Sequence, residues 1–129
     1  MARRRVLWLL PWSVSWTPGI QHPRTPDAYA GLAKLTDGCM STSGDYAATF
    51  SGDFLRHHIF DPATGRSPRE LASVTIVAPS GLHSDGLSTA VIVLGRKRGL
   101  KLLRSYPGAE AFLVLKNGET AMTPRFPTA

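Results

Sequence analysis

The clearest alternation of apolar and polar positions in the chain lies at residues 71–78. Val74, Ile76 and Ala78 alternate with small hydroxyl side chains, so one face of an extended segment is apolar and the other carries serine and threonine. A turn containing proline and glycine follows directly. We therefore predict a strand over residues 71–78 that packs its apolar face into the core.

Beyond that turn the apolar positions recur with helical spacing. This spacing predicts a helix over residues 82–94, with Ser80 or Ser84 placed to cap its N-terminus. Gly95, and a second glycine four residues later, predict a break before a second, basic helix over residues 100–106. Two helices are therefore expected after the central strand.

Other strands are predicted as hairpins. Residues 38–50 contain small and β-branched side chains interrupted by Gly44, which predicts one strand, a break, and a second strand over residues 46–50. After a turn at Ser51-Gly52-Asp53, residues 54–60 are expected to return as the partner of that second strand.

The two ends of the chain complete the pattern. Residues 109–116 predict a strand, Asn117-Gly118 a hairpin turn, and residues 119–123 the strand that pairs back. Residues 17–27, rich in proline, predict an extended connector, and residues 28–35 predict irregular or edge structure. The order of strands, helices and strands predicts an α+β fold in which hairpins pack against one or two helices.

Composition restricts the chain to one modest domain. It has 129 residues, of which 43% are hydrophobic and 19% charged, values close to the average for globular proteins. The single cysteine, Cys39, cannot form an internal disulfide, and no cysteine and histidine cluster has the spacing of a zinc site. A multidomain protein, a disulfide-stabilised secreted scaffold and a membrane bundle are thereby excluded.

Positive charge is concentrated in two places. The formal net charge is +6, and eight of the fifteen lysines and arginines lie at residues 3–5 or 96–104. Residues 1–16 combine three arginines with a short apolar stretch, which is typical of an irregular leader or a weak export signal and is too short to span a bilayer. Two basic patches, rather than a uniformly basic surface, explain the pI near 10.1.

Asp85 and Thr89 are the first candidates for chemistry. They are four residues apart in the predicted helix, so both side chains leave the same face, with Cβ atoms roughly 5–6 Å apart. A carboxylate and a hydroxyl, completed by phosphate oxygens and water, form the kind of ligand set that Mg²⁺ prefers. Taken alone, the pair is more typical of an acid that complements a helix dipole beside a packed threonine.

Two further clusters carry candidate residues. His57 and His58 are adjacent, so on an extended segment only one of them can face a site. A neutral histidine near a carboxylate such as Asp61 can shuttle a proton or orient a phosphate. Residues 42–46, with hydroxyls and a glycine, can approach a phosphate or a flavin. Each cluster alone is also typical of a structural histidine or a simple turn.

Together these clusters form an ordered set of motifs. In chain order they are Gly19-Ile20-Gln21-His22-Pro23, Thr42-Ser43-Gly44-Asp45-Tyr46, His58-Ile59-Phe60-Asp61-Pro62, Ser84-Asp85-Gly86-Leu87-Ser88-Thr89 and Val93-Leu94-Gly95. The set resembles the C-terminal part of ApbE-type FAD:protein FMN transferases over most of the chain. That resemblance implies Mg²⁺-dependent cleavage of FAD and transfer of FMN to a threonine or serine of an acceptor flavoprotein, or hydrolysis of FAD to FMN and AMP.

The resemblance also implies roles for individual residues. Asp85 and Thr89 match side-chain ligands of Mg²⁺, and His58 matches the functional histidine of the family. The residues implied on the flavin side are Thr42, Ser43, Gly44, Asp45 and Asp61. A metal ion between carboxylate and phosphate oxygens would neutralise the charge that develops as the diphosphate bond breaks.

Length is the main departure from the family. Its members are much longer, and their N-terminal part supplies much of the FAD cleft, including a backbone carbonyl on the metal. We therefore expect a truncated copy with impaired activity, whose missing N-terminal half would have to come from a second polypeptide. The implied partners are FAD and the acceptor flavoprotein, and no nucleic acid is expected. Family members often work outside the cytoplasm or anchored to a membrane, which leaves the localisation of this chain open.

Two other functions fit the sequence. A small basic module would use residues 96–104 on the phosphates of nucleic acid or on an anionic membrane, with residues 3–5 assisting. No aromatic side chain is interleaved there to stack on bases. An inactive remnant would instead fold poorly and expose apolar surface. Dependence of FAD binding on Asp85 would separate the transferase from both alternatives.

Overall fold

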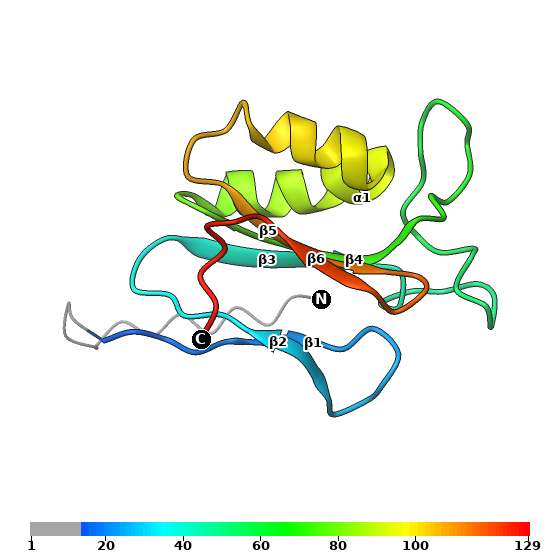
Figure 1. The fold of residues 1–129 in the computed structure, drawn as a ribbon. Helices are drawn as coiled ribbons and strands as arrows, with labels where there is room; N and C mark the ends of the chain where they lie inside the picture. The colour runs from blue at the N-terminus through cyan, green and yellow to red at the C-terminus, as the bar shows by residue number, and fades with distance from the viewer. Residues whose placement is uncertain (1–13) are drawn as a thin grey trace.

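The computed structural model describes residues 14–129, which form strands and one interrupted helix arranged in layers (Figure 1). In chain order the elements are β1 (Gly19–Gln21), β2 (Tyr29–Leu32), β3 (Cys39–Gly44), β4 (Leu71–Ala78), α1 (Gly81–Leu103), β5 (Glu110–Leu115) and β6 (Thr120–Met122). Antiparallel strands packed against a helical layer confirm the predicted α+β class.

The central sheet has four antiparallel strands in the order β3-β4-β5-β6. β4 is buried at every position, as expected for a strand with neighbours on both sides and layers on both faces. β5 and β6 form the C-terminal hairpin, in which the Gly118 N–H donates to the Leu115 carbonyl at 3.0 Å. The strands predicted around residues 71–78, 109–116 and 119–123 are therefore confirmed.

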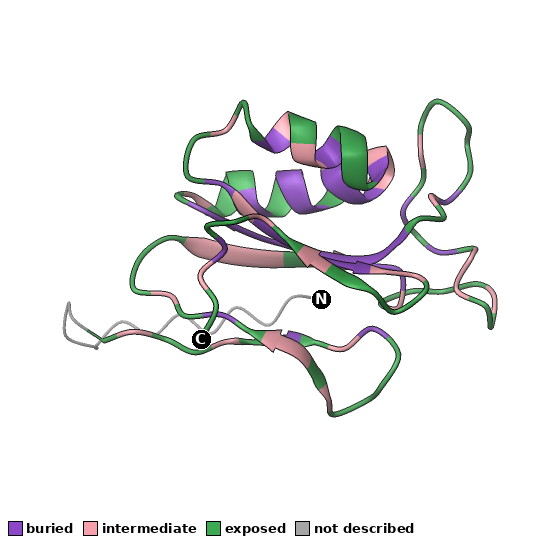
Figure 2. Ribbon diagram, viewed as in Figure 1, coloured by how far each residue is buried: buried purple, intermediate pink, exposed green. Residues whose placement is uncertain are grey.

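β4 separates two apolar clusters, one on each face of the sheet. Val74, Ile76 and Ala78 belong to the cluster that the helix covers, as their alternation predicts. On the opposite face, Val77 and Phe112 pack against the layer that contains β1, β2 and the C-terminal segment. Figure 2 shows the buried residues concentrated in β4 and in parts of the helix above it.

α1 begins after Ser80, whose side chain caps the first turn as one of the two predicted N-caps. The helix is interrupted at Gly95, where φ is 78° and ψ is 175°, and its second part folds back over the first (Figure 1). An added side chain at this position would meet the Glu70 carboxylate. Both the backbone angle and the available space therefore require glycine, and the predicted break is confirmed.

The prediction of a second helix over residues 100–106 is wrong at both ends. α1 continues directly after Gly95 and ends at Leu103. Gly99 does not break the helix, because it lies against Val91 where an added Cβ would not fit. This glycine allows the two parts of α1 to approach closely instead of forming a turn.

The prediction of a hairpin of two regular strands over residues 46–60 is wrong. Its two arms share one isolated bridge, between Thr49 and His57. At the tip, Phe54 has a left-handed φ of 58°, and the Asp53 carboxylate accepts hydrogen bonds within the turn. This local turn takes the chain away from the extended course that a β-ladder requires.

The N-terminal part of the described chain forms the layer beneath the sheet (Figure 1). β1 and β2 pair as a short antiparallel hairpin, within the region predicted as connector and edge structure. Trp16 and Leu35 extend the pairing through hydrogen bonds of 2.6 and 2.8 Å. Of the predicted leader, residues 1–13 lie outside the described residues. From residue 14 onward, no helix is both long and apolar enough to cross a membrane.

Candidate functional site

The first part of α1 carries Asp85 and Thr89 on its exposed side, one helical turn apart. Their neighbours Ser84 and Ser88 are fully buried, which fixes the orientation of the helix on the sheet. The Asp85 carboxylate has no hydrogen-bond partner within residues 14–129. The pair therefore presents a carboxylate and a hydroxyl oxygen on one helix face.

Serine hydroxyls join this part of the helix to the edge strand β3. Ser43 Oγ lies 2.9 Å from Thr89 Oγ1 and 2.7 Å from Ser88 Oγ. Ser41 Oγ makes the equivalent contact one turn earlier, 2.8 Å from Ser84 Oγ. The structure thus brings a predicted flavin-side residue, Ser43, directly beside a predicted metal ligand, Thr89.

Thr42 and Gly44 lie on the other face of β3. Thr42 Oγ1 is 2.7 Å from Thr75 Oγ1, a contact that satisfies the buried Thr75 hydroxyl. The ring of Tyr46 covers Gly44, where a Cβ would clash. Burial, and secondarily the Asp45 charge, raises the pKa of Tyr46. Among the described side-chain hydrogen bonds of the 42–46 cluster, only those of Ser43 reach α1.

Asp45 is fully buried and carries two ion pairs. Arg24 donates from Nη1 to Oδ1 and from Nη2 to Oδ2, both at 2.7 Å, and Lys116 Nζ donates to Oδ2 at 2.7 Å. Lys116 Nζ also donates to the Phe54 carbonyl at 2.6 Å, and the Arg24 guanidinium lies 3.9 Å from the centroid of the Phe54 ring. Asp45 therefore anchors the segment that leads to His58.

Exposure alternates along residues 56–60, with His57 buried and His58 exposed. His57 Nε2 lies 3.2 Å from the Pro68 carbonyl, and burial is the main cause that lowers the pKa of His57. His58 Nδ1 lies 3.2 Å from the Ala48 carbonyl oxygen. Because a carbonyl can only accept, we assign the ring proton to Nδ1, which leaves Nε2 of the neutral ring unprotonated. Of the two histidines, His58 is the one that can meet a ligand.

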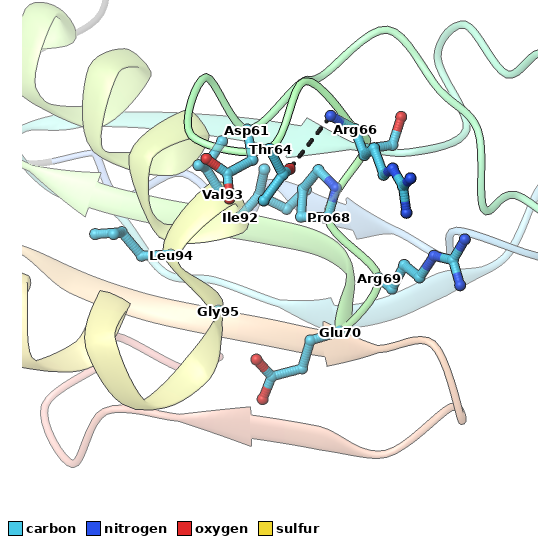
Figure 3. A pocket seen from close by; sticks show the side chains of 11 residues that line it. Asp61, Thr64, Arg66, Pro68, Arg69, Glu70, Ile92, Val93, Leu94 and Gly95 are labelled. Carbon is cyan, nitrogen blue, oxygen red and sulfur yellow. Dashed lines mark hydrogen bonds between the residues drawn. The ribbon is translucent and has the colours of Figure 1, made fainter.

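Asp61 lines a pocket of about 660 Å³ at the break in α1 (Figure 3). Residues 92–95 of α1 also line this pocket, together with the loop that follows Asp61. Val93 is four residues beyond Thr89, so the pocket continues the helix face that carries Asp85 and Thr89. The structure therefore brings Asp61 to the end of that face.

Comparison with known proteins places these features in one family. Residues 9–113 match the family model described as ApbE family, and the chain belongs to that family. The FAD:protein FMN transferase of Salmonella typhimurium is 35% identical over 119 residues, covering 88% of this chain and 34% of the relative. That of Treponema pallidum is 38% identical over 104 residues, covering 78% of this chain and 29% of the relative.

Solved structures give the same result. The ApbE protein of Thermotoga maritima has a TM-score of 0.75 at 36% identity, covering 85% of this chain and 36% of that protein. The apo form of the Pseudomonas stutzeri flavinyl transferase ApbE has a TM-score of 0.64 at 37% identity, and the match covers 85% of this chain and 35% of that protein. The chain thus spans about a third of the length of the relatives it matches. The family resemblance inferred from the motifs is confirmed.

Proposed function

We propose that this chain carries the diphosphate- and metal-binding part of an FAD:protein FMN transferase. The observation that supports this most directly is the 2.9 Å contact between Ser43 Oγ and Thr89 Oγ1, which sets a β3 hydroxyl beside the exposed Asp85 face. The name shared by the relatives, FAD:protein FMN transferase, supplies the substrate and the class of acceptor. The proposal concerns what these residues contribute to such a reaction.

Mg²⁺ fits the oxygen atoms at this face. The Asp85 carboxylate is exposed and has no partner in the described chain, so it is available to a cation, while Thr89 and Ser43 add hydroxyl oxygens. Residues 14–129 hold no group of three or more His, Cys, Asp or Glu side chains arranged for a metal ion. Phosphate oxygens and water would therefore supply further ligands. Bound there, Mg²⁺ would neutralise the charge of the diphosphate.

His58 would take the proton of the acceptor hydroxyl. Its Nδ1 donates to the Ala48 carbonyl, which leaves a lone pair on Nε2 of an exposed ring. The acceptor oxygen forms a bond to the FMN phosphorus, the bond from that phosphorus to the AMP oxygen breaks, and the hydroxyl proton moves to Nε2. Water in place of the acceptor would give FMN and AMP by the same steps.

Asp61 and Asp45 support different parts of this proposal. Asp61 lines the pocket at the end of the Asp85 face, where the flavin or the adenine of FAD would find space. Asp45 has both carboxylate oxygens in ion pairs, so we assign it the task of holding the Phe54 turn that precedes His58. Thr42 and Gly44 then shape the end of β3 on which Ser43 sits.

FAD binding in the presence and absence of Mg²⁺ tests the proposal. By calorimetric titration, Asp85→Asn should weaken FAD binding about tenfold or more in Mg²⁺ and less than about twofold in EDTA. Glu119→Gln is the matched control, because it removes an exposed acid at the β5–β6 turn, away from α1. Equal affinity of Asp85→Asn and the unaltered chain in Mg²⁺, or no effect of Mg²⁺ on the unaltered chain, would contradict the proposal.

A further inference from the structure

A second pocket, of about 460 Å³, lies on the loops around His58. Its side chains are mainly apolar or cationic: Phe50, Leu55 and Phe60, with Arg56, Arg66 and Arg69, and Ser67 adds a hydroxyl. No acidic side chain lines it. Phe50 and Phe60 are 67% and 54% exposed, a large apolar exposure for two neighbouring aromatic rings. The pocket therefore combines exposed apolar surface with positive charge.

The arginines of this pocket form no direct ion pair in the described part of the chain, and only Arg56 has a recorded charge effect on a nearby acid, the exposed Asp53. Arg56, Arg66 and Arg69 take part in none of the ion pairs found within residues 14–129. Glu70, next to Arg69 in the sequence, instead accepts a hydrogen bond from the Arg96 N–H at 3.0 Å. The charge of the pocket is thus left for a ligand that carries negative groups.

Five of the backbone N–H groups around the pocket already donate hydrogen bonds. The Phe50 N–H donates to the Arg56 carbonyl at 2.7 Å, and the Gly65 N–H donates to the Asp61 carbonyl at 2.8 Å. The N–H groups of residues 55, 56 and 66 donate to side-chain oxygens of neighbouring residues. Phosphate sites are commonly built from converging backbone N–H groups, and these five are already engaged. Recognition here would rest on arginine side chains, which suit carboxylates.

The pocket is lined by residues on both sides of His58 in the sequence. Arg56 and Phe60 each lie two positions from His58, and all three side chains are exposed. A segment bound in the pocket would therefore lie next to the imidazole to which we assign the proton of the acceptor hydroxyl.

We propose that this pocket docks a segment of the acceptor protein in which acidic side chains flank an apolar one. The inference rests on the proposed function, which requires a protein hydroxyl to approach His58. The apolar side chain would pack between Phe50 and Phe60, and the carboxylates would pair with the arginines. The diphosphate of FAD is assigned to the face that carries Asp85 and Thr89. Arg66 and Arg69 line both this pocket and the pocket beside Asp61, so Arg56 is the arginine that belongs to the docking site alone.

A fluorescent peptide of sequence Asp-Glu-Phe-Asp-Gly-Thr-Glu serves as the probe, with its Asn and Gln counterpart as reference. By fluorescence anisotropy, Arg56→Gln and Phe50→Ser should each weaken binding of the acidic peptide about fivefold or more. These two residues line this pocket and not the pocket beside Asp61. The matched controls are Arg98→Gln, an exposed cation on the second part of α1, and Leu82→Ser, which is 82% exposed. Both should change binding less than about twofold.

Two results would overturn the docking site. They are equal loss of binding in Arg56→Gln and Arg98→Gln, and equal binding of the acidic and neutral peptides. Failure of the proposed function would give a different result. Asp85→Asn would then leave Mg²⁺-dependent FAD binding unchanged, and this result does not depend on whether the peptide binds. Urea midpoints of the four variants, all at exposed positions, verify that each is folded.

Discussion

Lys116 and Asp45 are 71 residues apart in the sequence, and their Nζ and Oδ2 atoms are 2.7 Å apart in the fold. Arg24 binds both oxygens of the same carboxylate from the loop between β1 and β2. Asp45 is 0% exposed, whereas the side chains of Lys116 and Arg24 keep 13% and 29% of their surface exposed. One buried anion therefore holds two partly hydrated cations and ties the ends of β3 and β5 to the N-terminal layer.

Asp45→Asn should destabilise the fold by about 3–5 kcal/mol, because it leaves two cations without their buried partner. Urea unfolding gives the free energy of unfolding. Glu119→Gln removes the same charge at an exposed turn and should cost less than about 0.5 kcal/mol. Similar costs for the two variants would show that the ion pairs around Asp45 contribute little.

Stability should fall as the pH is lowered from about 7 to about 5, because burial lowers the pKa of His57. Below about pH 6.5 the unfolded chain binds a proton at this histidine that the folded chain excludes. The stabilisation is therefore complete above the unfolded pKa and is lost below it. Urea midpoints across this range should fall less steeply in His57→Gln than in the exposed control His83→Gln. Parallel slopes would contradict the assignment.

Alanine at two glycines of α1 should have opposite effects. Gly95→Ala should cost about 1–3 kcal/mol, since φ is 78° and the new methyl group meets the Glu70 carboxylate. Gly86→Ala should stabilise by about 0.5–1 kcal/mol, because it lies in a regular helical turn with nothing within 4 Å of the added Cβ. Thermal unfolding measures both changes. A destabilised Gly86→Ala would show that this helix face is less open than described.

Ser43→Ala should weaken Mg²⁺-dependent FAD binding about threefold to tenfold, because Thr89 loses the hydroxyl that orients it. Ser41→Ala is the matched control. It removes an equivalent contact, with Ser84, one turn earlier on the helix and should change affinity less than about twofold. Calorimetry with FAD in Mg²⁺ and in EDTA distinguishes the two. Equal effects of the two variants would assign both serines to packing alone.

Local patterns in the sequence suffice for the elements whose causes are local. Alternation at residues 71–78 predicts β4 and the face it buries, and Gly95 predicts the break in α1. Gly99 and Phe54 are the exceptions. The close approach of Gly99 to Val91 depends on how the two parts of α1 pack together. The turn at Phe54 is held by Lys116 and Arg24 as well as by Asp53, so neither feature follows from a short pattern.

In the candidate site, too, the features that depend on local geometry could be predicted, and those that depend on packing could not. The spacing of Asp85 and Thr89 predicts their shared helix face, because it depends on helix geometry alone. The contact of Ser43 with Thr89 depends on how α1 crosses β3, and the partners of Asp45 depend on the order of strands in the sheet. The roles of these residues toward Mg²⁺ and FAD stay predictions until binding is measured.

Glu70 connects the helical layer to the sheet through both its side chain and its backbone. The carboxylate accepts the Arg96 N–H at 3.0 Å, and the carbonyl accepts the Lys116 N–H at 3.0 Å. Amides in the first turn of a helix usually exchange quickly with deuterated solvent, because no preceding carbonyl holds them. The Arg96 amide is held from outside its helix, so its exchange rate reports how often the second part of α1 lifts away from the start of β4.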